Sequence, residues 1–339
     1  MSSNLYLNIK THTKMILSTS VQLAKTYLEK GGVIGLPTET VYGLAGNIWD
    51  QEAINKIFTI KERPKSHPLI AHVAHWEQVE SIATNIPAMA QLLADKFWPG
   101  PLTMILSAKP NVPSEATAGL GTIAVRMPEH PLALKLLSAL PFPLVAPSAN
   151  PFGKISPTSA MHVFSYFKGK IPLTLDGGNC KVGLESTIIG FKDDAVVIYR
   201  QGIISKDDIL EVIPNTAVYY DIDNQSNYPG SHRAHYAPKT PLIITDSLAE
   251  TLEKYANSKI GLLVLGSDTE STYSNIAAIR NLSKANDLKE AASNLYAFLH
   301  ELDSLNLDMI VAELFPASDL GIVLNDKLIR ASSQFDQHA

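Results

Sequence analysis

The chain contains a single cysteine, Cys180, among its 339 residues. One thiol excludes a framework of internal disulfides and is typical of proteins in a reducing compartment, so we expect a cytoplasmic protein. Long apolar stretches are also missing, because the longest clean one covers only residues 260–265. That is far below the roughly 20 residues needed to span a bilayer. The N-terminus, MSSNLYLNIKTHTK, is polar and lacks the pattern of a signal peptide. We therefore expect no membrane attachment.

Several common functional motifs are absent as well. The sequence has no G-x-x-x-x-G-K-[ST], no G-x-G-x-x-G that opens a βαβ unit, no G-x-S-x-G and no C-x-x-C. A P-loop, a dinucleotide fingerprint and a hydrolase nucleophile elbow are thereby excluded. His72 and His75 lie three apart, but no third histidine or cysteine completes a metal site, so we assign no metal to side chains. A bound nucleotide would have to be held by scattered cations and hydroxyls.

Charge is unevenly distributed along the chain. The net charge is −5, from 28 Lys and Arg against 33 Asp and Glu. Residues 242–339 hold 7 basic and 14 acidic residues, a balance of −7, which leaves 21 and 19, or +2, for residues 1–241. The first part could attract a small polyanion. No basic stripe with interleaved aromatic residues is present, which argues against nucleic-acid binding as the main role.

The hydrophobic pattern predicts an α/β protein. Helices are expected over residues 21–30, after Asp50, and over 87–97 and 131–140; strands are expected at 33–36, 69–73, 102–106, 122–126, 144–146, 186–190 and 196–199. Because the two types mix without strict alternation, a twisted mixed sheet is indicated for residues 1–213. Residues 214–241 are rich in turn formers and predict a connector. Strands at 241–245, 260–265 and 309–314 with a closing helix predict a smaller α/β domain over 242–339.

Two polar clusters follow predicted secondary structure in the first half of the chain. In GGVIGLPTETVYGLAG, residues 31–46, a short strand ends in Thr-Glu-Thr, and the carboxyl edge of an open α/β sheet is where ligands bind. The alternative is a turn whose threonines satisfy backbone groups. In KERPKSHPLIAH, Lys61, Arg63 and Lys65 follow a helix and would suit a triphosphate. The alternative is a solvated helix end, where cations are favoured.

Further polar groups stand at the ends of later strands. Arg126 ends an apolar strand, which is a costly place for a cation unless an anion meets it. The segment APSANPFGKISPT supplies Ser148, Asn150 and Ser156, whose small polar groups suit phosphate oxygens. LESTIIG at 184–190 adds hydroxyls, and IYRQG at 198–202 places Arg200 just past a strand.

Taken together, these segments resemble the YrdC-like family, in the longer two-domain form that makes threonylcarbamoyl-AMP. The resemblance covers nearly the whole chain and includes the tether SHRAHYAP at 231–238. It rests on PTETVYGL at 37–44, K-x-R-P at 61–64, PLIAH at 68–72, FWPGPLT at 97–103, T-x-A-V-R at 122–126, APSAN at 146–150, SPT at 156–158, ESTI at 185–188 and R-Q-G at 200–202. It implies a YrdC-like mixed open sheet with a smaller, Rossmann-like C-terminal domain.

The resemblance also implies a reaction and its residues. L-Threonine, bicarbonate or CO2, and ATP with Mg²⁺ would give L-threonylcarbamoyl-AMP and pyrophosphate. A separate transferase would use the product to modify the adenosine beside the anticodon of tRNA, and tRNA contact here would be weak or indirect. Lys61, Arg63 and Arg126 would act in catalysis. ATP would be bound by Lys61, Arg63, His67, Ser148, Asn150, Ser156, Arg200 and Tyr236, and L-threonine by Thr40, His72, Thr122, Arg126, Ala146 and Ser186.

Two alternative functions remain open at this point. One is a carbamoyl-adenylate-forming module, like that of hydrogenase-maturation carbamoyltransferases, although the acylphosphatase and zinc-finger segments of those proteins are absent. The other is an RNA-binding YrdC-like domain without catalysis, which the small +2 balance of residues 1–241 does not favour.

Overall fold

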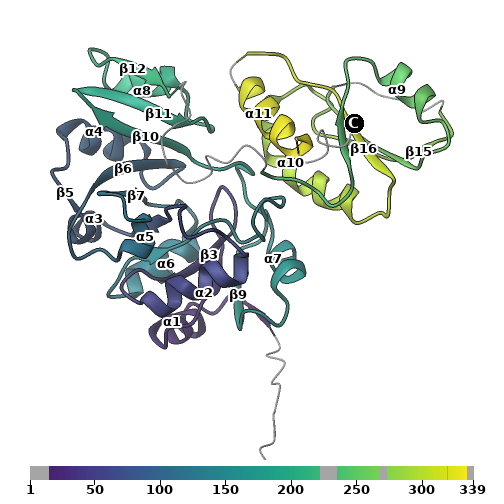
Figure 1. Cartoon of the computed structure of the whole chain (residues 1–339). Helices are drawn as coiled ribbons and strands as arrows, with labels where there is room; N and C mark the ends of the chain where they lie inside the picture. The colour runs from purple at the N-terminus through teal and green to yellow at the C-terminus, as the bar shows by residue number, and fades with distance from the viewer. Residues whose placement is uncertain (1–14, 222–234, 267–272, 319, 334–339) are drawn as a thin grey trace, which may run out of the picture.

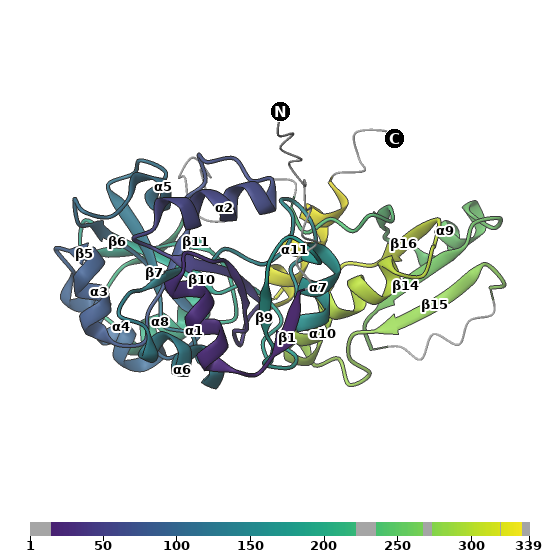
Figure 2. The same ribbon diagram turned by 90° about the horizontal axis from the view of Figure 1, so that it is seen from below.

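The computed structural model describes residues 15–221, 235–266, 273–318 and 320–333. Figures 1 and 2 show two α/β units side by side, each built on its own sheet. The predicted fold class is confirmed, as is the smaller C-terminal α/β domain. A connector was predicted over residues 214–241, and residues 222–234 of it lie outside the described part of the chain.

The first sheet is mixed and contains twelve strands in the described part of the chain. Its order is β1-β9-β2-β3-β8-β4-β7-β6-β10-β11-β12, and β5 pairs with β6. The strands are β1 (Ile16–Ser18), β2 (Ile34–Leu36), β3 (Gly43–Asn47), β4 (Ile70–His72), β5 (Ala83–Thr84), β6 (Leu102–Ala108), β7 (Thr122–Arg126), β8 (Leu144–Val145), β9 (Leu173–Leu175), β10 (Thr187–Lys192), β11 (Ala195–Arg200) and β12 (Val218–Tyr220).

Helices flank this sheet, and their starts follow from the sequence. Asp50 caps the second helix by accepting from the backbone N–H groups of Glu52 and Ala53, as predicted. That helix ends at Lys61, and Glu62 follows in the left-handed conformation at φ 55°. The turn directs Arg63 back toward the sheet. The helices are α1 (Val21–Glu29), α2 (Gln51–Lys61), α3 (Trp76–Ile82), α4 (Ala88–Phe97), α5 (Ser114–Thr117), α6 (Pro131–Ala139), α7 (Ala160–Phe167) and α8 (Lys206–Val212).

The second unit has a four-stranded parallel sheet in the order β13-β16-β14-β15. Its strands are β13 (Leu242–Ile244), β14 (Ile260–Val264), β15 (Ile276–Asn281) and β16 (Met309–Ala312), and its helices are α9 (Leu248–Lys254), α10 (Leu288–Asp303) and α11 (Leu320–Ser332). Helices α10 and α11 face the first unit (Figures 1 and 2). One apolar cluster joins both units, because Val41, Ile155 and Leu184 pack with Leu295 and Tyr296.

Six strands of the structure were not predicted from the sequence, namely β1, β3, β5, β9, β12 and β15. The first sheet extends past residue 213, because β12 pairs in parallel with β11 inside the segment predicted as a connector. Only Val218 of that strand is buried, so its apolar signal is weak. Strand β15 was not predicted, and its residues are at most half-buried at the edge of the second sheet. Edge strands of this kind carry little of the hydrophobic pattern that sequence analysis reads.

Candidate active site

A small cavity lies where loops and strand ends of the first unit meet the segment 235–236. Its internal volume is about 60 Å³, against the roughly 300–1,000 Å³ typical of sites for larger ligands. The chain segments that surround it are far apart in sequence. The polar residues lining it are Thr38, Thr40, Arg63, His72, Arg126, Ser148, Glu185, Ser186, Arg200, His235 and Tyr236, with Ala146 among the apolar ones.

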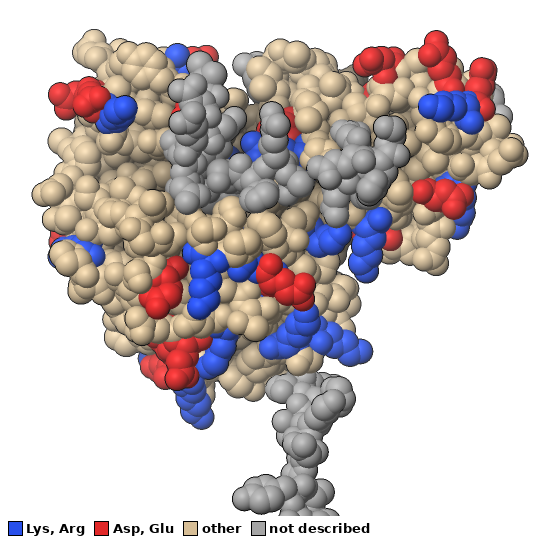
Figure 3. Space-filling model, in the orientation of Figure 1, with Lys and Arg blue, Asp and Glu red and all other residues tan. Residues whose placement is uncertain are grey.

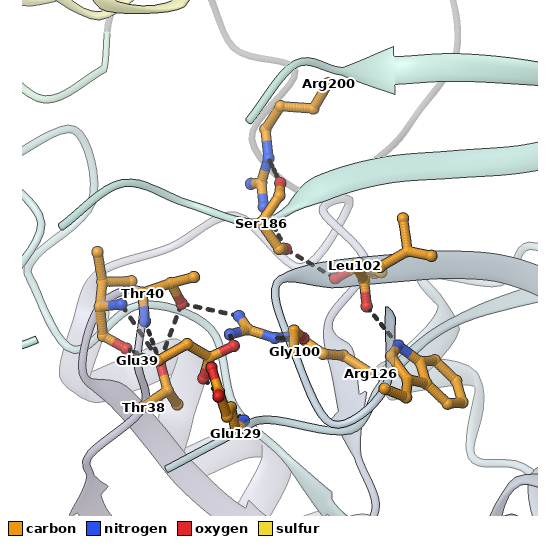
Figure 4. A network of polar contacts seen from close by, with 12 residues as sticks. Thr38, Glu39, Thr40, Gly100, Leu102, Arg126, Glu129, Ser186 and Arg200 are labelled. Carbon is orange, nitrogen blue, oxygen red and sulfur yellow. Dashed lines mark hydrogen bonds and ion pairs between the residues drawn. The ribbon is translucent and has the colours of Figure 1, made fainter. Parts of the chain in front are cut away.

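Arg126 ends strand β7 and is the centre of a buried polar network (Figure 4). Its Nη2 donates to Oε1 of Glu39 at 2.5 Å and its Nη1 to Oγ1 of Thr40 at 2.8 Å. Its Nε donates to the Gly100 carbonyl at 3.3 Å. These bonds use three of the five N–H donors of the guanidinium. Among the described residues, one donor on each terminal nitrogen is left for a ligand.

His72 stands beside this network, because β4 and β7 pair in parallel with His72 opposite Arg126. Its Nδ1 lies 3.1 Å from the Ile70 carbonyl. Burial and the nearby charge of Arg126 lower the pKa of His72 to about 3. The ring is therefore neutral at physiological pH, and its Nδ1 donates to the carbonyl. Its Nε2 is left as an acceptor at the cavity.

Ser186 and Arg200 are joined on the opposite wall (Figure 4). Nε of Arg200 donates to the Ser186 carbonyl at 3.0 Å, and its Nη2 to the Ser186 hydroxyl at 3.1 Å. The same hydroxyl is 2.7 Å from Oγ1 of Thr103 on the neighbouring strand β6. The strand pairing thus fixes a serine hydroxyl and holds the arginine to it.

Lys61 takes a different position from the one predicted. It is buried, but it does not line the cavity. Its Nζ donates to the carbonyls of Ser148 and Asn150, each at 2.5 Å. Burial and the charge of Arg63 lower the pKa of Lys61 well below its usual value. In the described structure Lys61 therefore binds the loop that carries Ser148.

Arg63 does line the cavity, and it is held loosely. Among the described residues it makes one hydrogen bond, from Nη2 to the Pro68 carbonyl at 3.2 Å, and its Nε is buried without a partner there. Its guanidinium carbon lies 6.0 Å from the centre of the Phe152 ring. Burial, followed by the charge of Arg200, lowers the pKa of Arg63 to about 10. A buried guanidinium with spare donors is suited to an anionic ligand.

Three predicted nucleotide residues lie behind the wall of the cavity. The centres of the His67 and Phe152 rings lie 5.4 Å apart. The Asn150 side chain donates to the carbonyls of Pro151 and Lys154. The Ser156 hydroxyl donates to Oε1 of Glu185 at 2.6 Å. None of the three lines the cavity, so each supports the loops that do.

Thr122, which was predicted as a threonine contact, does not line the cavity. It is exposed at the start of β7, whereas Arg126 ends the same strand. Four residues of strand separate the two by roughly 13 Å. The motif T-x-A-V-R therefore contributes its arginine to the cavity and its threonine to the opposite edge of the sheet.

The segment 235–237 closes the cavity. Ala237 donates its N–H to the Gly153 carbonyl at 2.8 Å, and His235 donates its N–H to the Arg330 carbonyl of α11 at 3.3 Å. The His235 ring contacts the Phe152 ring edge-on, and both His235 and Tyr236 are buried. Burial and then Arg63 lower the pKa of His235 well below its usual value, so the ring is neutral. The remaining tether residues, 231–234, lie outside the described chain.

Sequence analysis missed two carboxylates. Glu39 stands inside Thr-Glu-Thr and binds Arg126, while Glu185 opens ESTI and lines the cavity. Both stand inside motifs that carry the family resemblance, in which the neighbouring hydroxyl residues Thr40 and Ser186, and neither glutamate, were predicted as ligand contacts. The signal was the cost of a buried cation, since Arg126 at a strand end requires an anion and a glutamate is the nearest candidate.

Two arginines at strand ends, Arg126 and Arg200, and a third in the loop after helix α2, Arg63, line one cavity with several hydroxyls. The chain is therefore an α/β protein whose cavity is suited to a small anionic ligand. Residues 26–202 match the family described as "Telomere recombination", and residues 204–333 match "Threonylcarbamoyl-AMP synthase, C-terminal domain". The chain belongs to the threonylcarbamoyl-AMP synthase family, which confirms the resemblance found in the sequence.

Individual relatives are similar over most of their length. The threonylcarbamoyl-AMP synthase of Pyrococcus abyssi is 37% identical, covering 92% of this chain and 94% of that protein. The Bacillus subtilis protein of that name is also 37% identical, over 91% of this chain and 92% of its own. The crystal structure of P. abyssi Sua5 complexed with L-threonine matches with a TM-score of 0.83 and 36% identity, over 92% of this chain and 94% of that one.

Proposed function

We propose that this chain is an enzyme that makes L-threonylcarbamoyl-AMP from L-threonine, bicarbonate or CO2, and ATP, with release of pyrophosphate. The observation that carries the proposal is the convergence of Arg63, Arg126 and Arg200 on one cavity. The similarity to threonylcarbamoyl-AMP synthases over more than nine-tenths of the chain supports it.

L-Threonine would lie against the Arg126 side of the cavity. Among the described residues each terminal nitrogen of Arg126 has one N–H without a partner, and a planar guanidinium pairs with a carboxylate through two parallel hydrogen bonds. The neutral His72 ring offers an acceptor to the amino or hydroxyl group. Thr40 and the backbone of Ala146 also line the cavity, and Ser186 would reach threonine from the opposite wall.

ATP would lie against the Arg63 and Arg200 side. Arg63 has a buried Nε without a partner among the described residues. Ser148 lines the same cavity. Lys61 contributes by holding the carbonyls of that loop. Among the described residues no group of three or more metal-binding side chains occurs. Magnesium would therefore enter with the phosphates, whose oxygens Mg²⁺ prefers.

The reaction needs orientation and charge neutralisation more than a strong base. The threonine amine takes up CO2 to give a carbamate, whose oxygen attacks the α-phosphorus while the bond to pyrophosphate breaks. The attacking group is already an anion, so the arginines serve to hold it in line and to balance the charge of the leaving group.

The segment 235–236 would act as a lid. With His235 and Tyr236 in place the cavity holds only about 60 Å³, less than a nucleotide occupies, so the segment would move when ATP binds. Its return would enclose a carbamate, which readily loses carbon dioxide, and would exclude water from a mixed anhydride, which readily hydrolyses. Moving segments of this kind often limit turnover.

The proposed product would pass to a separate transferase that modifies tRNA, within the cytoplasm. The face in Figure 3 shows Lys and Arg interspersed with Asp and Glu, which favours a small-molecule enzyme over an RNA-binding module. No helix among the described residues has the length and apolarity to cross a membrane.

The test is the fate of isotopically labelled bicarbonate given to the purified protein with ATP and threonine. Label recovered in a threonine-containing adenylate supports the proposal, and carbamoyl phosphate should not replace bicarbonate. If carbamoyl phosphate alone supplied the carbamoyl group, the carbamoyl-adenylate alternative would hold. If the protein made no product but bound tRNA with a steep salt dependence, RNA binding would be its role.

A further inference from the structure

Glu185 is a buried carboxylate at the boundary between the two units. Its side chain is 6% exposed and lines the cavity. Among the described residues no lysine, arginine or histidine lies within ion-pair distance of it. It is held by hydroxyls instead. Oε1 accepts from Ser156 of the first unit at 2.6 Å, and Oε2 accepts from Tyr296 on α10 of the second unit at 2.9 Å.

The direction of these bonds is fixed by chemistry. An ionised carboxylate can only accept, so both hydroxyls donate. Ser156 is fully buried behind the cavity wall, whereas Glu185 lines the cavity. The Ser156 and Tyr296 hydroxyls therefore act together to hold the Glu185 carboxylate at that wall.

Tyr296 also contacts the segment that closes the cavity. Its ring centre is 5.4 Å from that of Tyr236, and both side chains are buried. On the next turn of α10, Nε2 of His300 lies 3.1 Å from the Ser156 carbonyl. One face of α10 therefore meets the carboxylate, the serine and the closing segment together.

We propose that Tyr296 is a positioning residue of the active site, which together with Ser156 fixes the Glu185 carboxylate at the cavity wall. The inference rests on the proposed function, because it takes Glu185 to face the ATP end of the cavity. The second unit is then part of the ATP site. Without the Tyr296 hydroxyl, one oxygen of a buried carboxylate loses its donor, and the carboxylate is expected to turn toward another partner.

The test uses the full chain with Tyr296→Phe, which removes one oxygen and keeps the ring. Binding of a non-hydrolysable ATP analogue and of L-threonine is measured by calorimetry. Loss of one hydrogen bond to a buried charge should weaken the ATP analogue about tenfold, while threonine binding stays unchanged. The control is Tyr166→Phe at the same boundary, whose hydroxyl donates to the Ile155 carbonyl at 3.1 Å and touches no side chain of the cavity.

Action through Glu185 is tested with Glu185→Gln and the double variant. If Tyr296 works through Glu185, the effect of Tyr296→Phe on ATP binding should shrink in the Glu185→Gln background. Additive effects, equal losses in Tyr296→Phe and Tyr166→Phe, or no loss at all would each overturn the inference. Thermal melting identifies a variant that fails to fold, and Glu185→Gln alone still reports on the ATP end. Unmodified protein that bound neither ligand would instead contradict the proposed function.

Discussion

Glu39 and Arg126 form a buried ion pair, with Oε1 and Nη2 2.5 Å apart and side chains 3% and 5% exposed. The second oxygen of Glu39 accepts from the Glu129 backbone N–H at 3.0 Å, so both carboxylate oxygens are occupied. Such a pair holds the guanidinium in one orientation. The N–H groups not used by Glu39, Thr40 and Gly100 are thereby aimed for a ligand.

Removing Glu39 should destabilise the fold. Glu39→Ala leaves a buried guanidinium without its anion, a loss that costs about 3–5 kcal/mol of unfolding free energy. The matched control is Glu301→Ala, since Glu301 pairs with Arg280 on the surface and such pairs contribute about 0–1 kcal/mol. Urea unfolding measures both. Equal losses in unfolding free energy in the two variants would show that the buried pair contributes no more to stability than the surface pair.

Arg126→Lys should impair threonine use selectively. The charge and much of the ion pair are retained, but a lysine cannot offer two parallel donors to a carboxylate. We expect the KM for threonine to rise at least about tenfold, the effect of losing one charged hydrogen bond, with the KM for ATP little changed. Arg280→Lys is the control. An unchanged KM for threonine in Arg126→Lys would remove Arg126 from the threonine site.

Lys61→Ala should loosen a loop as well as weaken ATP use. Because Lys61 binds the carbonyls of Ser148 and Asn150, amide hydrogen exchange should accelerate across residues 147–154. Mass spectrometry of exchanged peptides measures this, with Lys65→Ala as the control, since Lys65 is exposed and lies four residues after Lys61. Loss of ATP use with unchanged exchange would mean that Lys61 acts on the phosphates alone.

Acidification should destabilise the protein through buried neutral histidines. Burial lowers the pKa of His72 and His300 to about 3 and that of His162 to about 4, against about 6.5 in the unfolded chain. Below about pH 6.5 the unfolded state binds protons that the folded state does not, so stability falls toward acid by up to about 1.4 kcal/mol per pH unit for each group. Stability above that pH is unaffected by these groups.

The contribution of one histidine can be isolated. His300→Gln should lessen the dependence of unfolding free energy on pH by about 1.4 kcal/mol per unit between about pH 6 and about pH 5. The His300 ring stacks on the His162 ring, with 3.8 Å between the ring centres. Because the substitution removes this stacking, some loss of stability at neutral pH is also expected. The slope and not the absolute value is the readout. A slope equal to that of the unmodified chain would contradict the assignment.

His235→Ala should uncouple ATP consumption from synthesis. The His235 ring packs on Phe152 and closes the cavity, so its loss admits water to the reactive intermediates. We expect more pyrophosphate released per molecule of threonylcarbamoyl-AMP recovered, both quantified by chromatography. Lys239→Ala is the control, because Lys239 is exposed on the same segment. An unaltered ratio in His235→Ala would show that this ring does not exclude water.

Most of the fold could be predicted from the sequence, because its cues are local. The Asp50 cap and the start of α6 at Pro131 are where capping rules place them. Strands β1, β5, β9 and β12 were not predicted, since each is at most three residues long. Strand β3 contains two glycines among its five residues, and β15 is half-buried at an edge. Pairing partners and sheet order depend on contacts between distant residues, which no local pattern records.

The candidate site was predictable as residue types but not as geometry. Arg63, Arg126, Arg200 and Thr40 do meet around one cavity. Lys61 and Ser156 instead form hydrogen bonds with protein groups behind the cavity wall, because a buried polar side chain requires a hydrogen-bond partner. Thr122 does not line the cavity because it begins strand β7, whereas Arg126 ends it, and the two ends of a strand lie at opposite edges of the sheet.

The ion pair of Glu39 with Arg126 joins positions that are 87 residues apart in the sequence. The hydrogen bond from Lys61 to the Ser148 carbonyl also joins positions that are 87 residues apart. Contacts that span so much chain form late, since each requires a large loop to close first. A ribosome-bound fragment that ends before residue 126 has helices and short strands but no place for a substrate. Catalytic competence is thus a property of the finished polypeptide, and incomplete copies are expected to be inert toward ATP.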